Sequence, residues 1–353
     1  MTGANPSISP APGRPKASGS PAGGRAPKAT SGVVIRRAVH GVLLLDKPFG
    51  LSSNDALQKA KRLYRAEKAG HTGTLDPLAT GLLPLCFGAA TKFSQISLDA
   101  DKSYRATLKL GITTTTADAE GDVIETREVN VTRTQLQAAC EKFTGPIEQV
   151  PPMYSALKRD GKALYEYARA GIEVEREARA VTIHGIDIVG GEDASWTIDV
   201  RCSKGTYIRT LAEDIGAALG CGAHLSALRR TGSGALSLAG ALTLEQLAAM
   251  SDDERDAALM DADALLADWP LVRLGAEDAG RFLSGVRRRT SLPDAAHVRV
   301  YGPEPRAFLG GGQIAAGELI SSRLLSPVEV QGLLVSPESN SKEVITQERA
   351  ATP

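Results

Sequence analysis

Short apolar strands and amphipathic helices follow one another irregularly along this chain, and this order limits the folds it can adopt. Strand patterns are expected at residues 42–45, 104–110, 180–189 and 195–202, and helical patterns at 132–143 and 206–219, with a basic helix beginning at Ser52. The 123–129 segment is expected to pair with the 104–110 strand. Because the strict strand–helix–strand repeat of parallel folds is missing, the pattern predicts an α+β domain.

The two ends of the chain differ in composition from its middle. The first 32 residues are rich in Gly, Pro, Ala and Ser and are basic, so we expect a disordered basic arm over 1–36, which either touches RNA or only aids solubility. After an acidic helical region, residues 269–336 show short strand candidates separated by glycine turns, typical of a small β-rich module. Residues 337–353 are expected to form a flexible tail. Residues 37–268 then make up the main domain.

Composition excludes several classes of protein. The four cysteines are widely spaced, with no CxxC pair, and no apolar run approaches the roughly 18 residues of a membrane helix. Neither GxxxxGK[ST] nor GxGxxG occurs in the glycine-rich stretch, which disfavours a nucleotide cofactor. We therefore expect a cytoplasmic protein with no metal, no cofactor and no membrane contact.

The segment GHTGTLDPLATG, at residues 70–81, is the first candidate for chemistry. Pro77 fixes the backbone and favours an extended Asp76, and the glycines permit close approach of another strand. These features suit a positioned carboxylate. An aspartate before a proline is also a common way to start a turn, so the spacing alone leaves both interpretations open.

Several motifs taken together resemble the bacterial tRNA pseudouridine synthase B family. They follow one another in the family's order between about Gly41 and Gly240, and the central one is highly specific. The motifs are GVLLLDKPFGLSSND (41–55), GHTGTLDPLATGLLPLCFGAATKFSQ (70–95), DKSYRATLKLG (101–111), VPPMYSALKRDGKALYEYARAG (150–171), CSKGTYIRTLAEDIG (202–216) and HLSALRRTGSG (224–234).

The resemblance implies a fold, an activity and a partner. The fold would be that of the pseudouridine synthases, a large mixed but mainly antiparallel sheet flanked by helices, followed by a PUA-like RNA-binding domain over 269–336. The activity would be cofactor-free isomerisation of the T-loop uridine, position 55, to pseudouridine after base flipping. The partner would be the T-arm stem-loop of tRNA, bound by a monomer with no obligatory protein partner.

Site residues are carried over from the family's motifs position by position. The resemblance makes Asp76 the essential aspartate, Arg209 its cationic partner and Tyr104 the aromatic that stacks on the base and can move a proton. His71 would fill the gap that the flipped nucleotide leaves. Further substrate-binding positions are Tyr207, Leu228, Lys92 and Tyr154. Lys92 either meets RNA or braces the site, and the 150–156 segment that holds Tyr154 either lines the cleft or forms a rigid turn. Without the resemblance, most of these residues would be ordinary core or surface positions.

Charge is unevenly distributed although basic and acidic residues balance at 41 each. Residues 1–111 hold 16 basic and 6 acidic residues, a balance of +10, and the remainder a balance of −10. Since RNA binding requires phosphate neutralisation, we expect the RNA to cross the basic helix and two arginine clusters, and to leave the acidic region near residues 252–268 outside. The expected RNA-binding residues are Lys59, Arg62, Arg229, Arg230, Arg287, Arg288 and Arg289.

Two other functions remain as hypotheses. One is a non-catalytic RNA-binding or tRNA-folding factor that uses the same cleft, and the other is an unrelated hydrolase with an aspartate nucleophile. The absence of metal-ligand motifs and of an obvious general-base histidine disfavours the hydrolase. All the expected catalytic residues precede Asp268, so a chain truncated there is expected to keep some activity.

Overall fold

The computed structural model describes residues 35–305 and 307–335, and every structural statement below concerns these residues. The predicted basic arm, except for its last two residues, and the predicted C-terminal tail lie outside this part of the chain. No helix within it is long and apolar enough to cross a membrane.

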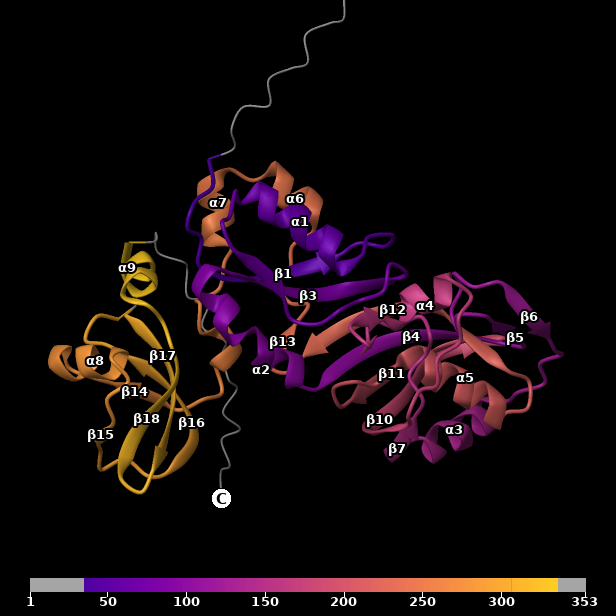
Figure 1. Ribbon diagram of the computed structural model, residues 1–353. Coiled ribbons are helices and arrows are strands. Elements are labelled where there is room, and N and C mark those ends of the chain that lie inside the picture. The colour runs from indigo at the N-terminus through magenta and orange to yellow at the C-terminus, as the bar shows by residue number, and fades with distance from the viewer. Residues whose placement is uncertain (1–34, 306, 336–353) are drawn as a thin grey trace, which may run out of the picture. The chain divides into compact units, whose positions relative to one another are not determined.

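A large mixed sheet is the centre of the fold (Figure 1). Its main strands run in the order β1-β3-β12-β4-β11-β10-β7, with β2 on β3 and β13 on β12. Of these neighbours in the described chain, only β3 and β12 are parallel, so the predicted mixed, mainly antiparallel sheet is confirmed. The strands are β1 (Gly41–Lys47), β2 (Ala69–His71), β3 (Ala79–Phe87), β4 (Lys102–Leu110), β7 (Gly145–Gln149), β10 (Arg179–Glu192), β11 (Ser195–Cys202), β12 (Ala223–Ser233) and β13 (Leu236–Ser237).

Several helices begin where the sequence supplies capping side chains. The Ser52 hydroxyl accepts a hydrogen bond from the Asp55 N–H at the start of α1 (Ser53–Leu63), and Thr132 and Gln135 form a capping box at α3 (Arg133–Lys142). The remaining helical elements are η1 (Gly88–Phe93), α2 (Ser94–Asp99), α4 (Leu164–Arg169), α5 (Ile208–Ala218), α6 (Leu244–Ala249), α7 (Asp252–Ala257), η2 (Ala264–Leu266), α8 (Ala276–Leu283) and α9 (Pro327–Val335).

Two hairpins project from the main sheet. One joins β5 (Ile112–Thr114) to β6 (Val123–Thr126), and the other joins β8 (Lys158–Arg159) to β9 (Lys162–Ala163). The expectation that the 123–129 segment pairs with the 104–110 strand is therefore wrong. Strand β4 ends just before Gly111, which has φ of +82°, and β5, which follows, is the strand that pairs with β6.

Two apolar layers hold the helices against the sheet. Helices α3 and α5 lie together over strands β10, β11 and β4 (Figure 1), where Leu108, Ile198 and Leu211 are buried in one core. At the other end of the sheet, α1 and α6 pack with β1 and β3 around Leu45 and Tyr64. The pocket described below is lined by residues of β4, β12, α5 and the loop that precedes β3.

A second, five-stranded sheet follows, and its core continues into the first. Its order is β14-β16-β17-β18-β15, with bounds Leu271–Arg273, Ala295–Tyr301, Phe308–Ala315, Glu318–Leu324 and Arg288–Arg289. The expected small β-rich module is thus present. One buried cluster joins its Phe282 and Val298 to Val42 of β1 and Phe93 of η1, and the rings of Phe93 and Phe308 lie 5.3 Å apart. The two sheets therefore share apolar packing.

Candidate active site

Asp76 lies in the short loop between β2 and β3, and α1 holds this loop in place. The buried Ser53 hydroxyl donates to the Leu75 carbonyl at 3.0 Å and accepts from the Leu75 N–H at 2.7 Å. Gly81 has φ of +98°, and a Cβ there would lie 2.3 Å from the carbonyl oxygen of Arg230, so glycine allows β12 to approach the end of the loop.

The Asp76 carboxylate contacts a buried arginine. Oδ2 lies 3.0 Å from Nη2 of Arg209, whose side chain is 6% exposed. Arg209 also lies 3.5 Å from the Asp118 carboxylate and donates to the Thr116 and Tyr154 carbonyl oxygens at 3.2 and 2.6 Å. Of the two interpretations that the sequence left open, the geometry favours the positioned carboxylate, because the side chain is directed to Arg209.

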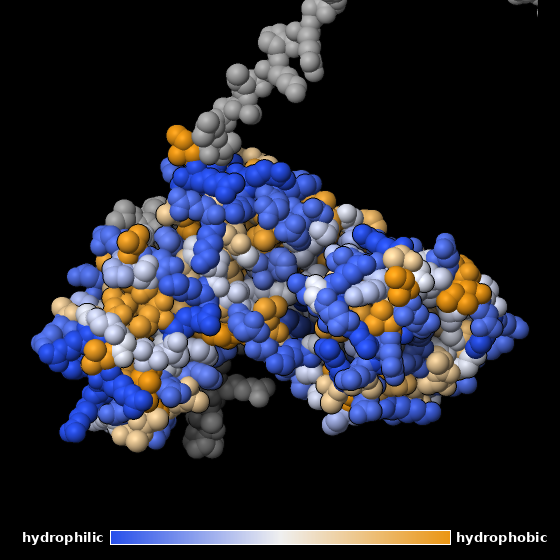
Figure 2. Space-filling view, in the orientation of Figure 1, coloured by the Kyte–Doolittle hydropathy of each residue, from blue (hydrophilic) through white to orange (hydrophobic). Residues whose placement is uncertain are grey.

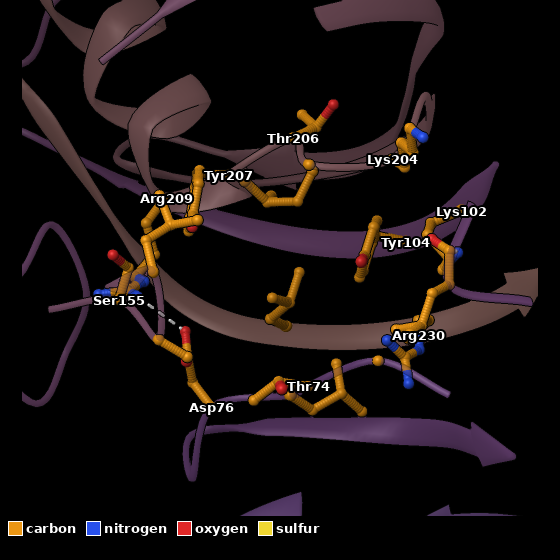
Figure 3. Close-up of a pocket in the computed structure, with 18 residues that line it drawn as sticks. Thr74, Asp76, Lys102, Tyr104, Ser155, Lys204, Thr206, Tyr207, Arg209 and Arg230 are labelled. Carbon is orange, nitrogen blue, oxygen red and sulfur yellow. Dashed lines mark hydrogen bonds and ion pairs between the residues drawn. The ribbon is translucent and has the colours of Figure 1, made fainter. Parts of the chain in front are cut away.

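Burial and neighbouring charges act on Asp76 in opposite directions. Burial raises the pKa of the Asp76 carboxyl, and Asp118 adds to this, whereas Arg209 and Lys47 oppose it. The side chain is still 39% exposed, because it faces a pocket (Figure 3). Asp76 is therefore accessible from the pocket and is held there by the cation of Arg209.

The pocket has a volume of about 340 Å³ and brings together most of the expected site residues. Asp76 and Arg209 lie at one end and Tyr104 at the other (Figure 3). Leu228 and Tyr207 also line it. Tyr104 comes from β4 and Leu228 from the neighbouring β12, so the pairing of these two strands fixes both side chains beside the loop that carries Asp76.

The structure corrects two of the expected binding residues. Arg230 is 1% exposed, so its expected place on an RNA-binding surface is wrong; it lines the pocket instead. Lys92 does not line the pocket. Its ammonium donates to the Leu324 carbonyl at 2.9 Å and pairs with Glu329 of α9 at 2.6 Å, so it joins η1 to the second sheet rather than meeting a substrate.

Two other expected residues lie beside the pocket rather than in it. The Tyr154 side chain lines an adjoining hollow with Thr116 and Met153, and only its carbonyl oxygen reaches Arg209. His71 ends β2, and its buried Nδ1 has no hydrogen-bond partner within the described chain. Burial lowers the pKa of His71, and the charge of Arg230 lowers it further.

Sequence reasoning missed two charged residues around Asp76. Asp118 is 2% exposed, and its carboxylate accepts from the Thr116 hydroxyl and the Glu120 N–H. Lys47 is fully buried and donates to the Pro48 and Leu51 carbonyls; burial lowers its pKa to about 8. In the sequence, Asp118 is part of DAEG at 118–121 and Lys47 is part of the DKP that ends β1. Neither pattern identifies a site residue until the fold is known.

The expected RNA-binding residues other than Arg230 are at least partly accessible, but several are already paired. Lys59, Arg62, Arg287 and Arg289 are exposed. Arg229 pairs with Asp46 at 2.6 Å, Arg287 with Glu318 at 3.3 Å, and Arg288 with Asp278. The acidic helix α7 lies against the end of the basic helix, where Asp252 and Asp256 pair with Arg65 and Arg37.

The cysteine thiols lie inside the fold. All four cysteines are buried, and burial raises the pKa of Cys86 to about 12 and that of Cys202 to about 11, as suits packing residues. Within the described ranges there is no group of three or more His, Cys, Asp or Glu side chains that could hold a metal ion.

A mixed sheet that presents an aspartate–arginine pair and a tyrosine to one pocket is the arrangement expected of a pseudouridine synthase. Comparison with known proteins agrees. Residues 61–208 match the N-terminal domain of TruB family pseudouridylate synthases, 209–267 the C-terminal domain of tRNA pseudouridylate synthase B, and 270–325 the C-terminal domain of pseudouridine synthase II TruB. The chain belongs to the TruB family, and it is a tRNA pseudouridine synthase.

Curated relatives match over most of their length. The tRNA pseudouridine synthase B of Burkholderia mallei is 61% identical over 299 residues, which cover 83% of this chain and 99% of that protein. The proteins of the same name from Ralstonia nicotianae and Verminephrobacter eiseniae are 62% and 57% identical, covering 82% and 88% of this chain and 95% and 96% of theirs.

Solved structures with a similar fold include chains from two multi-component complexes. A chain from a Cbf5-Nop10-Gar1 complex is 25% identical with a TM-score of 0.62, covering 82% of this chain and 87% of that one. A chain from an H/ACA RNP bound to a substrate RNA containing 2'-deoxyuridine is 23% identical with a TM-score of 0.62, over 82% and 86%. The pseudouridine synthase fold predicted from the sequence is confirmed.

Proposed function

We propose that this tRNA pseudouridine synthase acts on the uridine at position 55, in the T loop of tRNA, and that the uridine flips out of the T-arm stem-loop into the pocket beside Asp76. The observation that carries the proposal is the Asp76–Arg209 ion pair, 3.0 Å long, at one end of a pocket that has Tyr104 at the other. The remaining predictions, that the enzyme is a cytoplasmic monomer without an obligatory protein partner, form part of the same proposal.

Asp76 supplies the charge that the reaction needs. Breaking the C1'–N1 bond leaves positive character on the sugar, and an ionised carboxylate either bonds to this carbon, stabilises it without bonding, or adds to the base. All three routes require the ionised acid. Arg209 favours this form against the burial that opposes it.

Tyr104 acts on the base after it has turned. The ring stacks on the phenol, and its C5 bonds to C1' of the same sugar. The Tyr104 phenol then donates its proton to N1, and the phenolate that results takes the proton from C5. The C–H electron pair forms the C5–C6 double bond, and the C6–N1 π pair becomes the lone pair on N1. No atom is gained or lost, and Tyr104 returns to its starting form.

The other pocket residues bind and orient the nucleotide. Leu228 forms an apolar wall and Tyr207 a polar one, since both line the pocket. His71 has a lowered pKa and a buried, unpartnered Nδ1, so a neutral imidazole is available to stack in the gap left in the T loop. Unstacking a base costs a few kcal/mol, and stacking of the His71 imidazole in the gap offsets part of this cost.

The RNA backbone is proposed to contact exposed basic side chains on α1 and beside the second sheet. These are Lys59, Arg62, Arg287 and Arg289, together with the half-exposed Arg229 and Arg288. A basic set that the sequence reading missed joins them. Lys158, Arg159 and Arg169 are exposed on the β8–β9 hairpin and α4, and this hairpin directly follows Leu157, which lines the pocket. A phosphate backbone beside the flipped base would meet these side chains first.

The direct test is to incubate the protein with an unmodified tRNA transcript and map pseudouridine by position. We expect pseudouridine at position 55 alone. We expect none from Asp76→Asn when the fraction of tRNA bound is the same for the two proteins. Product at another position would overturn the proposed target. Undiminished product from Asp76→Asn would overturn the role of Asp76, and tRNA binding without any product would favour the non-catalytic RNA-binding factor.

A further inference from the structure

Arg230 is a buried cation without a carboxylate partner among the described residues. Its side chain is 1% exposed, and the ion pairs of the described chain do not include it. Its Nε donates to the Leu82 carbonyl at 2.6 Å, whereas its Nη2 is buried and has no hydrogen-bond partner in the same part of the chain. An isolated buried charge is costly, so a protein that keeps one needs a compensating use for it.

The fold sets Arg230 directly beside Tyr104. The two residues are opposite each other in the antiparallel β12–β4 pair, and both side chains lie at the same end of the pocket, away from Asp76 (Figure 3). Gly73, with φ of +109°, brings the catalytic loop close, and a Cβ there would lie 3.4 Å from Nη1 of Arg230. The guanidinium therefore sits between the catalytic loop and the phenol.

The other titratable groups near this pair do not neutralise the guanidinium. Burial raises the pKa of the Cys202 thiol to about 11, so it stays uncharged, and Asp76 pairs with Arg209. Lys102 donates to the carbonyls of the 97–100 turn, and burial lowers its pKa to about 8. The further groups that act on the pair are Lys47 and His71, both basic.

Charge and burial therefore act on Tyr104 in opposite directions. Burial raises the pKa of the Tyr104 phenol, and the Arg230 charge lowers it. Conversely, burial lowers the pKa of Arg230, and the Tyr104 phenol is the neighbour that favours the charged guanidinium. Each side chain thus stabilises the charged form of the other.

We propose that Arg230 is a positioning residue for Tyr104: its buried guanidinium orients the phenol and stabilises the phenolate that forms when Tyr104 gives its proton to the ring. This rests on the proton role proposed above for Tyr104. A purely structural role would instead depend on the hydrogen bond to the Leu82 carbonyl, which an uncharged donor could replace.

Two variants separate these roles. Arg230→Gln keeps a donor for the Leu82 carbonyl but removes the charge, and Arg230→Lys keeps the charge. Each is made in the full chain with 3,5-difluorotyrosine at position 104, whose more acidic phenol titrates under milder conditions and is followed by its absorbance. Arg105→Met is the matched control, since Arg105 neighbours Tyr104 on β4 but is exposed and pairs with Asp199 at 2.8 Å.

We expect the titration midpoint of residue 104 to rise by about 1 to 2 pH units in Arg230→Gln and to change little in Arg230→Lys and the control. With natural tyrosine, single-turnover pseudouridine formation by Arg230→Gln should slow roughly 10- to 100-fold at neutral pH, with tRNA affinity within about twofold. Its melting temperature should not fall, because a lone buried charge has been removed.

An unchanged midpoint in Arg230→Gln would overturn the inference, as would a slow Arg230→Lys beside a fast Arg230→Gln, the order that a hydrogen-bonding role predicts. The titration midpoint is measured without turnover, so it tests the effect of Arg230 on the phenol independently of the proton role of Tyr104. A Tyr104→Phe protein that forms pseudouridine as fast as the intact one would therefore refute the proton role of Tyr104 separately, whatever the midpoint shows.

Discussion

At the scale of single residues, the site depends on how Asp76 is kept ionised in a partly desolvated place. Burial and Asp118 raise the pKa of Asp76, and Arg209 and Lys47 limit that rise. The family's motifs predicted Asp76, Arg209 and Tyr104 as site residues, but not Asp118. A side chain that acts on another residue from a separate turn is recognisable only once the chain has folded.

The raised pKa of Asp76 predicts the pH dependence of activity. The proposed reaction needs the carboxylate, so single-turnover rates should fall on acidification at a higher pH than an ordinary aspartate would give. The folded state binds the Asp76 proton more tightly than the unfolded state does, because the pKa is raised on folding. The free energy of unfolding therefore falls as pH rises from the ordinary aspartate pKa through the raised one, and this loss persists at neutral pH. Asp76→Asn should thus be inactive, yet melt no lower than the intact protein at pH 7.

Rates measured from pH 4 to 8 and melting curves of both proteins check this prediction. The stability difference should shrink on acidification, since both side chains are then uncharged. A variant that melts several degrees lower at pH 7 would mean that the ion pair with Arg209 outweighs the desolvation of Asp76.

Asp118→Asn tests the residue that the sequence did not reveal. Arg209 would lose one of its two carboxylate partners, and the rate should drop by roughly 10- to 100-fold as the arginine shifts. The acidic limb of the pH profile should move to lower pH, because Asp118 raises the pKa of Asp76. The control is Asp122→Asn, an exposed acid on the same turn; an equal loss there would show a general effect on the hairpin.

At the scale of elements, local patterns predicted the strands and helices better than they predicted the connections between them. The apolar run of β1, the capping residues of α1 and α3 and the paired β10 and β11 all follow from short-range signals. The parallel neighbours β3 and β12 are about 140 residues apart in the chain, and the turn at Gly111 gave β6 another partner. Such pairings depend on the whole sheet, which no local pattern encodes.

The shared core between η1 and the second sheet changes what truncation should do. Phe93 is 1% exposed and packs on Phe308, so removing residues after 268 would leave a large apolar surface uncovered. The expectation that such a chain keeps some activity is therefore replaced by a prediction of misfolding. A milder test is Phe93→Ala, which should lower the free energy of unfolding by about 3 to 5 kcal/mol.

Chemical denaturation monitored by fluorescence and circular dichroism measures this loss. Both probes should give one common transition, because the packing is continuous. Phe49→Ala is the control, since Phe49 is 67% exposed and should change stability by no more than about 0.5 kcal/mol. Two separate transitions in the intact protein would contradict the shared core.

At the scale of the whole molecule, a net charge of zero does not describe the surface that meets RNA. Figure 2 shows hydrophilic side chains over the region of α1, α6 and α7, where the acids of α7 neutralise Arg65 and Arg37. Lys59 and Arg62 stay exposed on α1. The segregation of charge along the sequence thus survives folding only in part, because ion pairs between distant segments cancel some of it.

Charge reversal beside the second sheet tests whether the exposed basic side chains there bind tRNA. Arg287 and Arg289 are exposed, whereas Arg288 is partly buried against Asp278, so Arg287→Glu with Arg289→Glu changes the surface with little effect on folding. We expect tRNA affinity to fall at least tenfold at low salt, the difference from the intact protein to narrow as salt rises, and the single-turnover rate at saturating enzyme to stay within about threefold. The matched control is Arg105→Glu with Lys142→Glu, two exposed bases outside the proposed contact; an equal loss there would mean that the net charge of the molecule, rather than the second sheet, governs tRNA binding.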